Sequence, residues 1–371
     1  MVSELILHFG MEKTGSSSIQ RSFRGYDDGE IIYAPLEWNN HSMPIQVYFR
    51  PMEHQAPGMI QQGLTQAEYE ARRDHAGALL DAAFKVDRKR MLMSAEGALA
   101  LRRNQHLEMF QYFSDRCEKI RLIAYVRDPI SYASSAFQQG LKNGRSELEV
   151  SKQRFQLRIG RMLHVYGRDR MELIPFDPKS FRKESVVFDF ADRIGARITR
   201  LDESRANESM CMYAAAALFL WNREGMSSMG SQLKFQARTV LIRNLINPAP
   251  KHVQIMRKLA DLANLKSDND ERGLKKFRIS EQFVHDGIDP DDIAWMEKRL
   301  GVPLLRDPMP ESEDYGIRSQ EDFIQLGREA IVWLQPLIKR YGLKLEQNTT
   351  IDALNALYSL ILERNTKKAT A

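Results

Sequence analysis

The sequence has 371 residues, of which 43% are hydrophobic and 28% are charged, and its formal net charge is +5. These values are ordinary for a soluble globular protein with a substantial core. The mild basic excess fits simple solubility as well as an anionic ligand, because a basic cleft attracts anions. Cys117 and Cys211 are the only cysteines, which excludes a disulfide framework and predicts a reducing compartment.

The sequence predicts neither a signal peptide nor a membrane-spanning helix. Residues 1–9 lack a positively charged stretch, and their apolar run is too short for a secretion signal. The longest apolar run, residues 213–221, has less than half of the roughly 20 residues that a bilayer requires. We therefore expect a cytoplasmic protein.

The first half of the chain alternates short apolar runs with helical patterns. The predicted strands are residues 5–9, 91–94, 120–126 and 171–176. Several of these runs are nearly continuous in apolar character, as buried parallel strands are. Residues 68–85 and 186–194 carry apolar side chains at helical spacing. The alternation predicts an α/β fold, a P-loop-like parallel sheet flanked by helices.

Beyond about residue 205 the pattern becomes mainly helical. The predicted helices are residues 210–223, 291–300, 319–341 and 351–364. This change predicts an α/β core of residues 1–205 and a helical region of residues 206–371 packed on that core.

The first chemical motif occupies residues 5–20, with the sequence LILHFGMEKTGSSSIQ. A strand, a loop of small residues and a helix start bring backbone N–H groups together as an anion site. Gly10 and Gly15 allow close backbone approach, Lys13 adds a positive charge, and Ser16–Ser18 add hydroxyl donors. Such loops also cap helices without any ligand, so both interpretations remain open here. Because Lys13 precedes Gly15, the loop differs from the Walker A order of kinases and ATPases.

The second motif occupies residues 121–135, with the sequence RLIAYVRDPISYASS. Asp128 is a natural N-cap and Pro129 a natural first helical residue. Arg127 is therefore expected at the carboxyl end of its strand, where open α/β sheets bind ligands. Ser135 follows about two helical turns later. Arginine and serine are good phosphate donors, although an Arg127–Asp128 pair without any ligand explains this motif equally well.

Together the two motifs resemble those of sulfotransferases that use 3′-phosphoadenosine-5′-phosphosulfate (PAPS). KTGSSS at residues 13–18 is similar to the 5′-phosphosulfate loop of that family. Arg127 with Ser135, followed by FQQGLK at residues 137–142, is similar to its 3′-phosphate motif. Similarity to bacterial carbohydrate-type members continues through residues 166–167, 173–176 and 189–190, and the resemblance covers about residues 3–210.

The resemblance implies PAPS as co-substrate and no metal. The backbone of Thr14, Gly15, Ser16, Ser17 and Ser18, together with Lys13, would bind the 5′-phosphosulfate, and Arg127 with Ser135 would bind the 3′-phosphate. Lys13 would also act in catalysis, by neutralising charge on the leaving oxygen. No cluster of residues in the sequence has metal-ligand spacing.

A catalytic base would activate the acceptor hydroxyl. Glu96 follows the predicted strand 91–94, and relatives in the family carry their base at the corresponding strand end. A carboxylate that complements a helix dipole is the alternative role for Glu96. His41 is the reserve candidate for the base, and His8 is expected to be a packing residue.

The expected function is thus O-sulfation of a hydroxyl-bearing acceptor, a glycan or glycolipid by the resemblance, with no nucleic acid as partner. The helical region of residues 206–371 would cover the acceptor site. A P-loop-like nucleotide kinase and a non-catalytic nucleotide-binding protein are the alternatives. Trp38, Tyr48, Arg50 and the Arg102–Arg103 pair are candidates for an acceptor cleft, although surface or core positions explain them as well.

Overall fold

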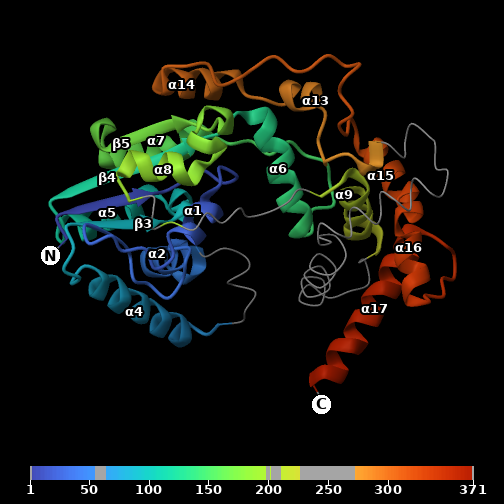
Figure 1. Ribbon diagram of the computed structural model, residues 1–371, viewed down its shortest axis with the longest axis horizontal. Coiled ribbons are helices and arrows are strands. Elements are labelled where there is room, and N and C mark those ends of the chain that lie inside the picture. Colours follow the sequence, from blue (N-terminus) through green and yellow to red (C-terminus); the bar gives the residue numbers. More distant parts are fainter. Residues whose placement is uncertain (1, 55–63, 198–200, 202–209, 226–271, 370–371) are drawn as a thin grey trace. The chain divides into compact units, whose positions relative to one another are not determined.

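The computed structural model describes residues 2–54, 64–197, 201, 210–225 and 272–369, with side chains to residue 360. It divides into two compact units (Figure 1). The first comprises Met1–Asp128, Gln153–Ala206 and Asp289–Arg306, and the second comprises Pro129–Lys152, Asn207–Ile288 and Asp307–Ala371. The expected boundary between residues 205 and 206 lies outside the described residues.

The first unit contains a five-stranded parallel sheet with the order β2-β3-β1-β4-β5. Its strands are β1 (Glu4–His8), β2 (Ile31–Tyr33), β3 (Arg90–Ser94), β4 (Lys119–Val126) and β5 (Met171–Pro175). His8 pairs with Ser94 on one side and with Ile123 on the other. The carboxyl ends of β1, β3 and β4 therefore meet at one edge, in the middle of the sheet.

This sheet confirms the α/β fold predicted from the apolar runs. The four predicted strands correspond to β1, β3, β4 and β5, each within two residues at either end. Strand β2 was missed, because its three residues are too few to show a periodic pattern.

Both faces of the sheet are covered. Helices α1 (Ser16–Ser22) and α8 (Val186–Ile194) pack on the face that carries Ile6, where Phe23 and Phe190 are fully buried. Side chains alternate along a strand, so Leu5 and Leu7 point to the opposite face, and both are also fully buried.

Four helices of this unit pack successively against one another: α4 on α2, α2 on α5, and α5 on α7. Their bounds are α2 (Ser42–Phe49), α4 (Gln66–Ala83), α5 (Arg103–Ser114) and α7 (Phe155–Tyr166). Helix α14 (Pro290–Leu300) contacts α7 and β5 although it lies far along the sequence. The helix predicted for residues 291–300 is therefore present, and it packs on elements of the first unit.

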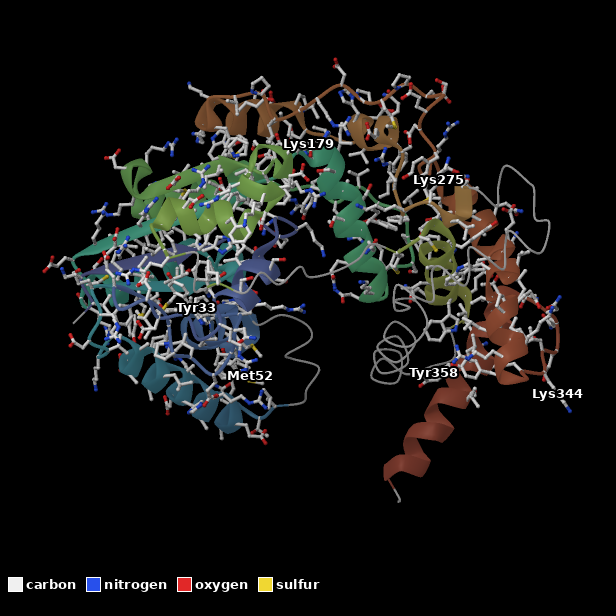
Figure 2. All side chains as sticks on the ribbon, viewed as in Figure 1. Tyr33, Met52, Lys179, Lys275, Lys344 and Tyr358 are labelled. Atoms are coloured by element: carbon white, nitrogen blue, oxygen red, sulfur yellow. The ribbon has the colours of Figure 1, made fainter. Side chains whose placement is uncertain are left out.

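The second unit is built from helices in the part of it that the structure describes. They are α6 (Pro129–Lys142), α9 (Met212–Leu220), α13 (Glu281–Asp286), α15 (Gln320–Glu329), α16 (Ile331–Tyr341) and α17 (Thr350–Ala369). The rings of Phe219 and Phe323 stack at 4.4 Å between centroids, and Phe137 and Phe277 surround them. Tyr358 on α17, which Figure 2 labels, has its ring 6.1 Å from that of Trp221 between centroids.

This unit confirms the helical C-terminal region, with one difference in detail. The single helix predicted for residues 319–341 is two helices, α15 and α16, which meet at Ala330. The apolar spacing continues across the break, so the pattern alone did not reveal it. In the described ranges, no helix combines the length and apolar content that crossing a bilayer requires.

Candidate functional site

The loop between β1 and α1 contains three residues in the left-handed region of backbone conformation. Gly10, Lys13 and Gly15 all have positive φ, at 55°, 68° and 81°. The left-handed region is uncommon for lysine and is found where the surrounding structure imposes it. The buried Thr14 hydroxyl fastens the turn by donating to the Met11 carbonyl at 2.5 Å. Such a loop directs successive N–H groups to one side, which is the geometry that binds an anion.

The two glycines of the loop have no room for a side chain. A Cβ on Gly10 would lie 2.7 Å from Ser16 Oγ and 3.3 Å from Glu96 Cβ. A Cβ on Gly15 would lie 2.7 Å from Val186 Cγ1. The loop is thus packed between the start of α1, Glu96 and the start of α8.

The Ser16 hydroxyl lies at the start of α1, beside the Glu96 carboxyl. It is buried. A buried hydroxyl needs a hydrogen-bond partner, and the Glu96 carboxyl beside it serves as one, since this hydroxyl lowers the pKa of Glu96. The first N–H groups of α1 lack partners within the helix. An anion bound in the loop would accept hydrogen bonds from these N–H groups.

Glu96 begins a short 3₁₀ turn, Glu96–Ala100, directly after β3. Its Oε2 accepts from Gln20 Nε2 at 3.2 Å, and its Oε1 accepts from Asn40 Nδ2 at 3.3 Å. Burial raises the pKa of the Glu96 carboxyl, and the neighbouring hydroxyl and amide donors oppose that shift without cancelling it. A carboxylate that takes up a proton more readily than usual is suited to general-base chemistry.

Arg127 connects the end of β4 to the loop between β1 and α1. Its Nη1 donates to the Lys13 carbonyl oxygen at 2.7 Å, while its own carbonyl accepts from Gln153 Nε2 at 2.9 Å. Its guanidinium also lies 5.6 Å from the centre of the Phe176 ring. Ser135 lies on α6 in the second unit, so its expected pairing with Arg127 stays a prediction.

The histidines at this edge are deeply buried. His8 Nδ1 lies 2.8 Å from Ser94 Oγ, and His41 Nδ1 accepts from the Ser94 N–H at 3.2 Å. The His41 ring packs 4.4 Å from that of Tyr33, which Figure 2 labels. Burial lowers the pKa of His8 and of His41 to about 3. Both rings are therefore neutral at physiological pH.

The structure brings Lys13, Gly15, Ser16, Glu96 and Arg127 together at one sheet edge, by the contacts given above. Sequence reasoning missed Gln20 and Asn40, the two amides that hold Glu96. Gln20 had a usable signal, since it lies one helical turn after Ser16 on the same face. Asn40 had none, because only the fold brings it to a carboxylate 56 residues away.

Within the described residues, no group of three or more His, Cys, Asp or Glu side chains is arranged to hold a metal ion. The acceptor-cleft candidates are dispersed. Trp38 borders a pocket, whereas Arg102 and Arg103 are exposed where α5 begins.

Comparison with known proteins gives limited information. No family model and no curated protein matches the chain. Among solved structures, it is similar to a sulfotransferase from Alicyclobacillus acidocaldarius, with 15% identity and a TM-score of 0.37 over 68% of this chain and 99% of that one. It is also similar to the sulfotransferase domain of the Synechococcus PCC 7002 olefin synthase, with 14% identity and a TM-score of 0.33. That match covers 71% of this chain and 94% of the other. Scores this low carry no argument about function.

Proposed function

We propose that this chain is a sulfotransferase that transfers a sulfuryl group from PAPS to an acceptor hydroxyl. One observation carries the proposal: a Cβ on Gly10 would meet both the Ser16 hydroxyl and Glu96, so the loop, the start of α1 and this carboxyl lie together. A loop suited to an anion and a partly buried carboxylate are thereby immediate neighbours. Transfer requires a sulfate and a hydroxyl held about 3 to 3.5 Å apart, and this pair of groups is suited to hold one each.

In the proposed reaction, the acceptor oxygen forms a bond to sulfur as the bond between sulfur and the bridging oxygen breaks. That oxygen leaves with the electron pair on adenosine 3′,5′-bisphosphate (PAP), and the products are PAP and a sulfate ester. Glu96 takes the acceptor proton, and Lys13 neutralises the charge on the leaving oxygen. The N–H groups of Thr14–Ser18 would bind the 5′-phosphate, and Arg127 with Ser135 the 3′-phosphate.

Glu96 fits the role of base better than His41 does. Nδ1 of His41 already accepts from the Ser94 N–H, and the side chain is fully buried. Its lowered pKa also makes it a poor proton acceptor. Glu96 is partly accessible, and its pKa is shifted toward the range where a general base is most effective.

We further propose a cytoplasmic location and a glycan or glycolipid acceptor, as the sequence resemblance implies. Cys117 and Cys211 are both free thiols, which suits a reducing compartment.

Calorimetry with PAP and with ATP, each with and without Mg²⁺, tests the class of ligand. We expect PAP to bind in the micromolar range without any metal. Tighter binding of ATP with Mg²⁺ than of PAP would overturn the proposal. Turnover of labelled PAPS then distinguishes an enzyme from a protein that only binds the nucleotide.

A further inference from the structure

A pocket of about 340 Å³ lies between α2 and α4 in the first unit. Its walls are mostly apolar and include Trp38, Met43, Val47, Ala71 and Ala76. Sites for small ligands range from about 300 to 1,000 Å³, so this volume suits one ring or a short alkyl chain.

Most of the polar groups of the pocket belong to three residues. Nε2 of His75 pairs with the Glu37 carboxylate at 2.9 Å, both side chains being about half exposed, and Arg72 is the third. Away from these residues, a sugar ring buried in the pocket would lose most of its hydrogen bonds to water without replacement, which is costly. An apolar group loses nothing comparable and gains about 0.8 kcal/mol for each methylene buried.

The pocket is joined to Glu96 through helix α2. Ser42 Oγ accepts from the Gly97 N–H at 2.8 Å, and Gln46 Nε2 donates to the Gly97 carbonyl at 2.9 Å. This face of α2 therefore holds the segment that carries Glu96. Met43 and Val47 each follow one position later, which is a rotation of about 100° around the helix, and they line the pocket.

The chain entering α2 makes a second connection. Trp38 borders the pocket, and Asn40 donates to the Glu96 carboxylate. Two residues of chain span at most about 7 Å. The pocket wall at Trp38 is thus a near neighbour in the chain of the residue that donates to the proposed base.

We propose that this pocket binds an apolar part of the acceptor. The acceptor is then an amphiphilic alcohol, with its reacting hydroxyl at Glu96 and an alkyl or aryl group between α2 and α4. The inference rests on the proposed function, and it selects a glycolipid-like acceptor over a free glycan.

The test uses β-D-glucosides with methyl, butyl, hexyl and octyl chains, titrated into the full-length protein below their micelle concentrations. In calorimetry without PAPS, we expect the dissociation constant to fall about threefold to fourfold for each added methylene until the pocket is full. Equal affinity for methyl and octyl glucoside would overturn the proposal.

Ala71 and Ala78 are both exposed on α4, but only Ala71 lines the pocket, so Ala71→Glu adds a carboxylate at the pocket and Ala78→Glu adds one away from it. Ala71→Glu should abolish the dependence on chain length, and Ala78→Glu should preserve it. Ala71→Trp adds an indole at the pocket wall and should make affinity level off at a shorter chain. If both glutamate variants flatten the series equally, the alkyl chain binds elsewhere.

Turnover separates this inference from the proposed function. With labelled PAPS, KM should fall along the same series in the wild type and in Ala78→Glu, but not in Ala71→Glu. Absence of PAP binding would contradict the sulfotransferase proposal while leaving the alkyl titration interpretable. Normal turnover with no dependence of KM on chain length would overturn the pocket inference alone.

Discussion

Nη1 of Arg127 donates a hydrogen bond to the backbone carbonyl oxygen of Lys13 at 2.7 Å, across 114 residues of sequence. The second motif, residues 121–135, thereby stabilises the conformation of the first motif, residues 5–20. Lys13 is in the left-handed conformation, which a lysine adopts at a cost of roughly 1–2 kcal/mol. The bond from Arg127 helps to maintain that conformation. The two motifs therefore support each other structurally, in addition to their proposed roles in binding the ligand.

This bond gives Arg127 and Ser135 different expected phenotypes. Ser135→Ala should weaken the binding of PAP alone. The binding of adenosine 5′-phosphosulfate, which lacks the 3′-phosphate, should be unaffected. Arg127→Ala should weaken both ligands, with the larger loss for PAP, because the variant also releases the Lys13 carbonyl. A charge-assisted contact is worth about 1.5–3 kcal/mol, which is roughly a 10- to 150-fold loss of affinity. Calorimetry measures both ligands, and equal losses of PAP and adenosine 5′-phosphosulfate affinity in both variants would mean that neither residue reads the 3′-phosphate.

Lys13 combines backbone strain with a proposed catalytic charge, and substitution should separate the two. Asparagine tolerates positive φ better than lysine does. Lys13→Asn should therefore preserve or raise the unfolding temperature while lowering kcat with every acceptor, since charge develops on the leaving oxygen whatever the acceptor is. Lys13→Arg retains the charge and is the matched control. Unchanged turnover in Lys13→Asn would remove lysine from the proposed mechanism.

The sheet and the edge that carries the candidate site were largely predictable from the sequence, since buried parallel strands are continuous apolar runs. The sequence also placed residues 10–18, Glu96 and Arg127 after such runs, and strand ends share an edge in a parallel sheet. What it did not reveal were contacts that depend on packing. The bond from Arg127 to Lys13 and the amide of Asn40 on Glu96 both join distant segments.

The division of the chain was less predictable for the same reason. Helix α14 has an amphipathic pattern that is clear in the sequence, but no local feature shows that it packs on α7 and β5. Helix α6 follows β4 directly in sequence and yet belongs to the second unit. Local patterns specify elements, whereas their partners depend on surfaces that form only in the fold.

Glu96→Gln should reduce turnover by a factor of about 10² to 10⁴, the usual range for loss of a general base. PAP affinity should remain nearly unchanged, because the carboxylate acts on the acceptor. Glu118→Gln, at an exposed site, is the control for the change of residue type. Near-normal turnover in Glu96→Gln together with complete loss in His41→Asn would transfer the role of base to His41.

The raised pKa of Glu96 also predicts how rate and stability depend on pH. Turnover should decline as pH falls through that pKa, so the acid limb should lie above the usual glutamate value of 4.5 and should be absent in Glu96→Gln. Because burial disfavours the charged form, ionised Glu96 lowers stability at high pH. Glu96→Gln should therefore raise the unfolding temperature at pH 8 more than at pH 4. Equal effects at the two pH values would contradict a buried, titrating carboxyl.

His41 should contribute to acid sensitivity of the fold. Its pKa is about 3 in the folded protein and 6.5 ordinarily, so the stability from its neutral form is complete above pH 6.5 and is lost as pH falls toward 3. His41→Asn retains an acceptor for the Ser94 N–H but removes the titration. Urea unfolding measures the free energy of unfolding at each pH. As pH falls from about 7.5 to about 5, this free energy should fall less in His41→Asn than in the wild type, by roughly 1 kcal/mol per pH unit. His75→Asn, at an exposed position, should retain the full loss, and identical losses in His41→Asn and wild type would contradict the assignment.

Gly10 and Gly25 offer a matched pair for testing whether the loop shapes the anion site. Both have positive φ, at 55° and 71°, so alanine at either position costs about 1–2 kcal/mol of backbone strain. Around Gly25 nothing lies within 4 Å of an added Cβ, whereas at Gly10 the Cβ would lie 2.7 Å from Ser16 Oγ and 3.3 Å from Glu96 Cβ. Gly25→Ala should therefore lower the unfolding temperature and leave PAP affinity and turnover intact.

Gly10→Ala should show the same thermal loss or more, and in addition should displace the Ser16 hydroxyl and Glu96 from each other. Loss of one hydrogen bond to the ligand corresponds to about tenfold weaker binding of PAP. Displacement of the proposed base should in addition lower the turnover rate. Thermal unfolding, PAP calorimetry and labelled-PAPS turnover on the two variants separate strain from site geometry. If Gly10→Ala binds PAP and turns over like Gly25→Ala, then the contact of Gly10 with both groups is only packing, and the neighbourhood that supports sulfuryl transfer must lie elsewhere.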